Sequence, residues 1–171
     1  MKKILIVIMV LFAGITGCRA AGPRPPIELP FAIHQAGASV STELRIVKEQ
    51  NYPFMLNFMF EENDNADRER VRKLIGYHGK DRQGHFIEPG IQIPLKITIN
   101  VIDSVGERLF FEKEVLTMGM HGYGASHFTR KIDSIKLVPG LYRVTVQSLN
   151  DVPELVNTIV NLGVYLRESG K

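Results

Sequence analysis

The loop Met118–Gly124 holds the residues best suited to binding. Its order, Met-Gly-Met-His-Gly-Tyr-Gly, places three glycines within six residues, which permits positive φ angles or close approach of a partner to the backbone. Methionine and tyrosine at the surface provide adaptable apolar contact. We therefore predict a binding site formed by Met120, His121, Tyr123 and the nearby His127. The alternative is a flexible hairpin connection without a ligand.

The same loop is not a phosphate-binding loop, because it lacks Gly-Lys-Ser/Thr and no helical pattern follows it. The histidines also lack the close spacing of metal motifs, such as two histidines four residues apart on a helix. Hydrogen-bonded or solvated loop histidines explain the pattern better than a metal site, and we expect no metal and no cofactor. The histidines in question are His78, His85, His121 and His127.

Asn63, Asn65 and Asp67 alternate like the start of a calcium-binding loop. Arg68 occupies the place where such a loop needs glycine, and no glutamate stands at its twelfth position. Capping of a helix is the better explanation for these polar residues.

Motifs for covalent catalysis are missing from the sequence. It contains no Gly-x-Ser-x-Gly, no thiol near a histidine and no carboxylate pair in a recognisable setting. We therefore expect a protein that is not an enzyme. An envelope enzyme or a carrier of a small ligand or metal, built on loop histidines, remains the alternative because distant residues can assemble a site.

Cys18 is the only cysteine in the chain and follows a positively charged start and an apolar run that ends at Gly14. This is the order of a secretory signal, and the run is shorter than the roughly 20 residues of a membrane-spanning helix. Ile15-Thr16-Gly17-Cys18 resembles the lipobox of bacterial lipoproteins. The resemblance implies that residues 1–17 are removed and that Cys18 carries diacylglycerol and an acylated amine, with fatty acids such as palmitate. The alternative is a cysteine left over after a cleavage that ignores it.

In the lipoproteins that this leader resembles, an aspartate after the lipidated cysteine retains the protein in the inner membrane. Arg19 stands at that position, so the resemblance implies anchoring to the outer membrane, on the periplasmic side. With a single cysteine, the folded part has no disulfide available in this oxidising compartment.

The basic pI of about 9.0 depends partly on the leader. Lys2 and Lys3 account for two of the 21 basic residues, so the rest of the chain carries 19 basic and 18 acidic residues. Nucleic-acid binding needs a concentrated basic face, which a nearly neutral chain does not indicate. We expect no nucleic-acid partner.

Residues 18–30 read as a lipidated cysteine followed by a tether, since four of the nine prolines lie at positions 23, 25, 26 and 30. Proline favours the extended polyproline II conformation, so this tether would span roughly 35 Å. We place the folded domain at residues 31–171.

Alternation of apolar and polar residues predicts an all-β domain. The clearest case is Ile91–Val101, where every second residue is apolar, and Tyr52–Phe60 is apolar on both faces, as in a central strand. Turn residues separate seven such segments, which favours an antiparallel immunoglobulin-like β-sandwich. The predicted strands are 41–50, 52–60, 91–101, 108–117, 126–137, 141–149 and 158–166.

One short helix interrupts the strands at residues 65–75. Asp64 can cap its start, Val71, Leu74 and Ile75 form an apolar stripe, and Gly76 can end it. An acidic first turn and a basic last turn match the helix dipole. We expect the stripe to pack on an edge or end of a sheet.

Pro139-Gly140 predicts a turn, and Tyr142 then enters a strand that contains Val144 and Val146. This arrangement is similar to the tyrosine corner of immunoglobulin-like sandwiches, in which the hydroxyl bonds back to the preceding turn. A tyrosine that merely begins a strand is the alternative.

The run from Pro139-Gly140-Leu141-Tyr142-Arg143 to Asp151-Val152-Pro153 resembles the DUF5625 type of small Gram-negative lipoprotein, a domain of unknown function. The likeness extends from about Leu29 to Leu166 and implies a β-sandwich without known catalytic residues. The function expected is a lipid-anchored, non-enzymatic module that binds a periplasmic or envelope protein, such as an immunity protein against a toxin. Its partners would be the bilayer, through Cys18, and that protein.

Overall fold

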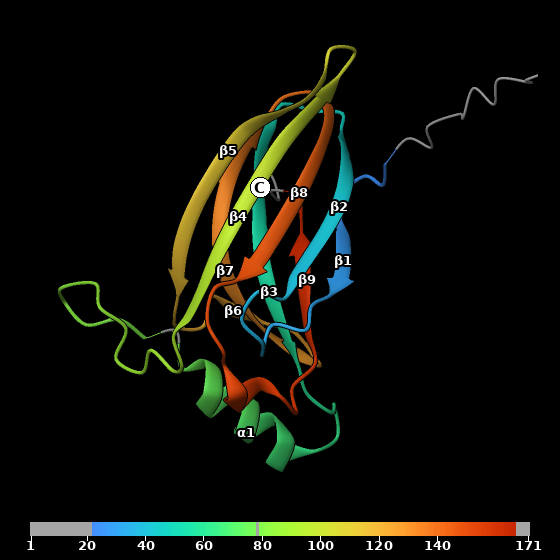
Figure 1. The fold of residues 1–171 in the computed structure, drawn as a ribbon. Coiled ribbons are helices and arrows are strands. Elements are labelled where there is room, and N and C mark those ends of the chain that lie inside the picture. Colours follow the sequence, from blue (N-terminus) through green and yellow to red (C-terminus); the bar gives the residue numbers. More distant parts are fainter. Residues whose placement is uncertain (1–21, 78, 167–171) are drawn as a thin grey trace, which may run out of the picture.

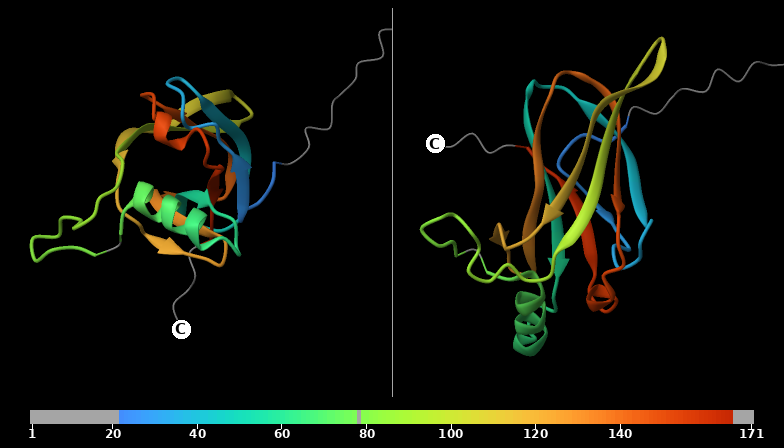
Figure 2. Two further views of the ribbon diagram at one scale, coloured as in Figure 1. Left: turned by 90° about the horizontal axis from the view of Figure 1, so that it is seen from below. Right: turned by 60° about the vertical axis from the view of Figure 1, so that its left-hand side comes forward.

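The computed structural model describes residues 22–77 and 79–166 as two antiparallel sheets packed face to face, with one α-helix at one end (Figures 1 and 2). The first sheet has the order β1 (Ile27–Pro30), β9 (Val160–Val164), β3 (Gln50–Met59), β7 (His127–Leu137), β6 (Gly122–Tyr123). The second has the order β2 (Ser39–Ile46), β8 (Gly140–Ser148), β4 (Ile93–Asp103), β5 (Gly106–Thr117). The predicted all-β sandwich with one inserted helix is confirmed.

The core lies between the two sheets because the strands alternate as the sequence predicts. In β4, Ile93, Leu95, Ile97 and Ile99 are all buried, while the residues between them face outward. Strand β3 lies between β9 and β7, as predicted for a central strand; one of its faces is buried in the core and the other is mostly half-buried. A strand that slipped by one residue would turn its core face toward solvent, so this alternation fixes the register.

The first long strand and the last strand have other neighbours than in an immunoglobulin constant domain. There the first strand pairs with the second and the last with the penultimate. Here the first long strand, β2, pairs with the penultimate β8, and the last strand, β9, pairs with β3. The two sheets and the neighbours β3–β7 and β8–β4 keep the sandwich arrangement.

Two tyrosine hydroxyls bind the turns that precede their own strands. Tyr142 donates a hydrogen bond to the Val138 carbonyl over 3.0 Å, which confirms the predicted tyrosine corner. Tyr52, at the start of β3, does the same to the Lys48 carbonyl over 2.8 Å. Both phenols are otherwise buried, so these bonds satisfy their polar ends and fix the two turns at one end of the sandwich.

Helix α1 spans Asn65–Ile75, as predicted, at the opposite end of the sandwich (Figure 1, bottom; Figure 2, left). The Asp64 carboxylate accepts hydrogen bonds from the Ala66 and Asp67 amides, and Gly76 ends the helix at φ 80°. Val71 and Ile75, on the inward side of the helix, are buried. A short 3-10 helix, η1 (Pro153–Leu155), lies at the same end.

The sandwich begins earlier than the sequence indicated. Ile27–Pro30, which we assigned to the tether, pair with β9 as strand β1. The Arg45 amide also donates to the Pro23 carbonyl over 2.9 Å, so the chain already lies against β2 at that point. Proline is tolerated in such an edge strand, where an amide hydrogen is not needed, and this explains why a proline-rich segment is part of the sheet.

Tyr165 joins β1 to the centre of its sheet. Its hydroxyl donates to Glu28 of β1 and accepts from the Asn57 amide of β3. Burial and the Glu28 carboxylate raise the pKa of Tyr165 to about 12, so the phenol stays neutral at physiological pH. The ring lies so close to Gly163 that a Cβ there would approach it to 2.4 Å.

Cys18 and the predicted leader lie outside the described residues. Within residues 22–77 and 79–166, no helix has the length and apolar character needed to cross a membrane.

Candidate functional site

A groove with a volume of about 480 Å³ lies between α1 and the segment 120–128. On one side, α1 provides charged side chains and Tyr77, just after the helix, provides an aromatic ring. On the other side, the segment around β6 provides apolar side chains. The main lining residues are Arg68, Arg72, Tyr77, Met120, Tyr123 and Phe128. The groove therefore combines an apolar surface with guanidinium groups.

Arg68 is held over two aromatic rings at the groove. Its guanidinium carbon lies 5.6 Å from the centre of the Phe60 ring and 6.0 Å from that of Phe128. These rings are themselves in contact, with centroids 4.8 Å apart. No carboxylate pairs with Arg68 in the described part of the chain. The stacked guanidinium is thus oriented, and its N–H groups are available to an incoming acceptor.

The charge of Arg72, one turn further along α1, is already used within the domain. It donates to Glu69 over 2.8 Å and to Glu88 over 3.3 Å. The Arg72 guanidinium lowers the pKa of Glu69, and both carboxylates raise the pKa of Arg72. Glu69, the carboxylate that lines the groove, therefore stays ionised and bonded instead of acting as a free base.

Only two of the four residues predicted as a binding site lie together in the groove. Met120 is buried and Tyr123 is 71% exposed, and both line the groove. His121 instead faces two other hollows on the far side of the loop, beside Lys131. The ring of His127 packs against Gly124, where a Cβ would meet it at 2.4 Å. The structure thus brings together Met120 and Tyr123 but not the two histidines.

The loop polar groups do not assemble a metal site in the described part of the chain, where no group of three or more metal-binding side chains is found. The carboxylate in the segment that resembles a calcium loop, Asp67, is already bonded within the chain. Asp67 accepts from the Glu61 amide over 2.9 Å and from Arg70, while Asp64 caps α1. These bonds agree with the capping interpretation.

Arg130 is the residue that holds the groove end together, and the sequence pattern did not single it out. Although fully buried, it reaches the last carbonyls of α1, with Nη2 2.6 Å from the Ile75 oxygen and 3.3 Å from the Leu74 oxygen. It also donates to the carbonyls of Pro89, Ile91 and Thr117. The alternation of β7 carried the signal, because Arg130 lies between the inward-facing Phe128 and Ile132.

Burial lowers the pKa of Arg130 to about 10, so the guanidinium is still charged at neutral pH. The ring of Phe58 lies 5.6 Å from its central carbon. A cation suits the carboxyl end of a helix, where the unpaired carbonyls carry partial negative charge. Arg130 therefore anchors α1 through carbonyl groups, without an acidic partner in the described part of the chain.

Comparison with known proteins identifies the domain. The family model described as "Domain of unknown function (DUF5625)" matches residues 28–166. The chain belongs to the DUF5625 family. A crystal structure of a protein from Sulfurospirillum deleyianum is similar to this chain at 25% sequence identity and a TM-score of 0.73, covering 84% of this chain and 98% of that one. No curated protein matches the chain.

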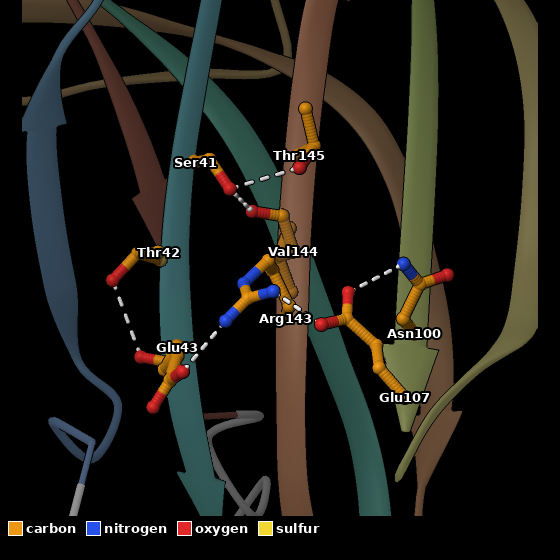
Figure 3. Close-up of polar contacts among 8 residues, drawn as sticks. All are labelled: Ser41, Thr42, Glu43, Asn100, Glu107, Arg143, Val144 and Thr145. Atoms are coloured by element: carbon orange, nitrogen blue, oxygen red, sulfur yellow. Dashed lines mark hydrogen bonds and ion pairs between the residues drawn. The ribbon is translucent and has the colours of Figure 1, made fainter. Parts of the chain in front are cut away.

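The outer face of the second sheet of this DUF5625 domain carries a separate polar cluster around Arg143 (Figure 3). Its guanidinium bridges Glu43 on β2, at 2.8 Å, and Glu107 on β5. Glu107 also accepts from the Asn100 amide over 2.8 Å. Because both of these carboxylates are bonded to Arg143, the cluster links β2, β8 and β5, and Asn100 adds β4. The Arg143 guanidinium is therefore not available to a ligand.

The loop that follows α1 in the DUF5625 domain is fixed at its base by two glycines. Gly76 and Gly90 both have positive φ, of 80° and 64°, and lie back to back. A Cβ on Gly90 would lie 2.4 Å from the Ile75 carbonyl carbon. The tight contact sets the position of Tyr77, and hence one side of the groove.

We expect Gly90→Ala to destabilise the groove end of the domain far more than Gly84→Ala in the same loop. Gly84 has a similar φ of 87°, but nothing lies within 4 Å of its added Cβ. The control thus carries only the left-handed backbone cost of about 1–2 kcal/mol, whereas Gly90→Ala adds a backbone clash. Urea unfolding of both variants measures the difference. Equal losses of stability would show that the packed base does not matter.

Proposed function

We propose that this chain is a lipoprotein that Cys18 anchors to the outer membrane on its periplasmic side, and that it binds an envelope or periplasmic protein through the α1 groove. The observation that supports the binding role best is the composition of the groove. Tyrosine, arginine, methionine and phenylalanine, the residues enriched in protein interfaces, line it together.

The chemistry of the lining defines the kind of partner. The available guanidinium of Arg68 suits a carboxylate, and the exposed ring of Tyr123 suits an apolar side chain. A protein segment that carries an acidic residue beside an apolar one matches both. An immunity protein that neutralises a toxin in the periplasm is one role of this kind.

An enzymatic role gains less support from the same groove. The acidic residue on its lining, Glu69, is bonded to Arg72, and neither His121 nor His127 lines the groove. A binding module needs no free general base, so this arrangement favours recognition over catalysis.

The anchor and the groove are compatible in position. The first described residues, 22–23, lie beside the far part of β2. Helix α1, which lines the groove, lies at the other end of the sandwich (Figure 1). A chain held through Cys18 would therefore direct the groove away from the bilayer.

Photocrosslinking in intact cells tests the binding role. A benzoylphenylalanine in place of Tyr123 should form a covalent product with one specific protein, which mass spectrometry identifies. Binding of that purified protein should then weaken by about tenfold or more in Arg68→Ser, as expected when an interface anchor is removed. Arg108→Ser, which removes an exposed arginine paired with Asp103 at the other end, is the matched control and should bind normally.

Two results would contradict the proposal. One is the absence of any specific product from position 123. The other is a partner whose affinity falls equally in Arg68→Ser and Arg108→Ser, because the groove would then not be the contact surface.

A further inference from the structure

Three turns at the end of the sandwich opposite α1 each expose a valine. Val47 follows β2 and is 55% exposed, Val105 joins β4 to β5 and is 85% exposed, and Val138 joins β7 to β8 and is 45% exposed. All three turns lie at the top of the view in Figure 1. Turns normally carry glycine, proline and polar residues, so a valine in each is unusual.

Two more apolar side chains are exposed on β5, a few residues after the Val105 turn. Leu109 is 63% exposed, and Phe110 lies at a bulge of the strand with its ring 5.5 Å from that of Tyr142. Single apolar residues at a surface need no explanation, but a group at one end marks a contact region. We call Val47, Val105, Leu109, Phe110 and Val138 the apolar tip.

The turns of the apolar tip are held by specific hydrogen bonds. Tyr52 binds the carbonyl next to Val47 in sequence, that of Lys48, and Tyr142 binds the carbonyl of Val138 itself. In the third turn, the Asp103 carboxylate accepts from the Val105 amide over 2.9 Å. The valines are thus presented on a fixed backbone, which reduces the entropy lost when such a surface binds.

Charge near the tip is partly paired. Arg108 bonds Asp103, and Lys136 bonds Glu49 over 2.6 Å. Lys48 and Arg45 form no ion pair with any residue in the described part of the chain, so they leave two positive charges beside Val47. Exposed valines next to unpaired basic side chains suit the boundary between the headgroups and acyl chains of an anionic membrane.

The length of chain before the described residues brings a membrane close to this end. Gly22 lies against Glu43 of β2, and Pro23 is bonded to Arg45, two residues before Val47. Only four peptide steps separate Gly22 from Cys18, a reach of at most about 14 Å. Under the proposed anchoring at Cys18, the bilayer therefore lies within a short distance of this region.

We propose that the apolar tip rests in the surface of the lipid bilayer to which Cys18 is attached. This inference rests on the proposed anchor and adds a second, non-covalent contact to it. The domain is then held at a defined orientation, with α1 pointing away from the membrane, instead of swinging on a tether.

A single tryptophan can test this contact, because the chain contains none. The full-length lipidated protein with Val105→Trp is reconstituted in vesicles of phosphatidylethanolamine and phosphatidylglycerol, with and without brominated acyl chains. We expect the tryptophan of the reconstituted protein to emit at shorter wavelength than the same tryptophan in the Cys18→Ser protein, measured in buffer without lipid or detergent. We also expect the brominated lipid to quench this emission. Val156→Trp is the matched control, since Val156 is an exposed valine that follows η1 at the α1 end. Its emission should not respond.

A second measurement follows vesicle binding by flotation for the chain from residue 18 onward with Cys18→Ser, so that neither lipid nor the apolar leader contributes. Val105→Asp should weaken this binding by about tenfold, the effect of removing one valine side chain from an apolar environment. Val156→Asp should leave it unchanged.

Mass spectrometry of the reconstituted protein separates the possible failures. A lipidated Cys18 together with a Val105→Trp emission that brominated lipid does not quench would overturn the tip contact and leave the anchor standing. A shift to shorter wavelength without quenching would assign the tip to a protein surface, such as a second copy of the chain, and would also overturn it. A Cys18 without lipid would overturn the anchor and the contact together.

Discussion

Arg130→Met will lower the free energy of unfolding by about 3–5 kcal/mol, the cost expected when a buried charged hydrogen-bonding group is removed. The methionine fills part of the volume of the arginine stem but offers no N–H groups. The carbonyls of Ile75 and Ile91 would then lose their donor inside the domain, while that of Leu74 would keep only the Ile91 amide. Water can reach them only if α1 and the loop after it move away.

This loss is large in comparison with the stability of a domain, which is about 5–15 kcal/mol. It also acts on the groove, because Arg130 is the link between the end of α1 and β7. We therefore expect a partner protein to bind Arg130→Met poorly even at low temperature, where the remaining sandwich is folded. Arg130→Lys should recover only a part of the stability, since one ammonium cannot reach carbonyls on three segments, the end of α1, the loop 89–91 and the end of β5.

Urea unfolding followed by circular dichroism measures the effect. Arg143→Met is the matched control, an arginine on the neighbouring sheet whose guanidinium is partly exposed and bridges Glu43 and Glu107 (Figure 3). Exposed ion pairs contribute little, so its loss should stay within about 1 kcal/mol. If the two variants lost equal stability, Arg130 would not be the structural link that its contacts indicate.

The sequence was sufficient for the helix and most strands because local signals and tertiary packing agree there. Asp64, the stripe of Val71 and Ile75, and Gly76 each specify one property of α1, and the helix has the predicted bounds. The period of two in β4 likewise matches a strand with one buried face. Where several independent signals coincide, the structure follows them.

Strand β1 was missed because its composition argues for something else. Four prolines between residues 23 and 30 indicate an isolated extended segment, and nothing local shows that β9 lies beside it. Strand β6 was missed for another reason, since its two residues, Gly122 and Tyr123, are too few for any alternation to be visible. Both strands are defined by distant partners, which a local pattern does not contain.

The candidate site was predicted in part for a similar reason. The loop 118–124 was identified from its glycines, but the partner surface on α1, above all Arg68, is 50 residues earlier in the chain. Chain order cannot reveal that a helix lies across from a loop. Within the loop, adjacent side chains point to different sides, so Met120 lines the groove while His121 faces away.

The shorter tether changes the expectation for the anchored protein. A spacer of roughly 35 Å would have kept the domain clear of the bilayer. With β1 part of the sheet and Pro23 bonded to Arg45, only residues 19–22 separate Cys18 from the first bonded position of the domain. The orientation proposed for the groove therefore depends on the proposed attachment at Cys18.

Under the proposed anchoring, we expect Cys18→Ser to abolish attachment of lipid. The thioether to diacylglycerol needs the cysteine sulfur, and the predicted cleavage before residue 18 follows that modification, so the leader should remain uncut or be cut elsewhere. A single acyl chain binds a membrane only marginally, at about 0.8 kcal/mol per buried methylene, whereas the several chains of a lipoprotein hold it stably. Removal of all of them is thus expected to release the domain or to leave it attached only by an uncleaved leader.

Labelling of cells with a radioactive fatty acid separates these cases when it is combined with the mass of the purified product. Arg19→Asp is the matched control, because it changes the residue that the lipoprotein sorting rule reads but leaves the thiol in place. It should keep the label and shift the protein from the outer to the inner membrane. Label that persists in Cys18→Ser would mean that fatty acid reaches the chain by another route. The anchor would then have to be sought at a different residue, and the small number of residues between position 18 and Pro23 would no longer support the proposed orientation of the groove.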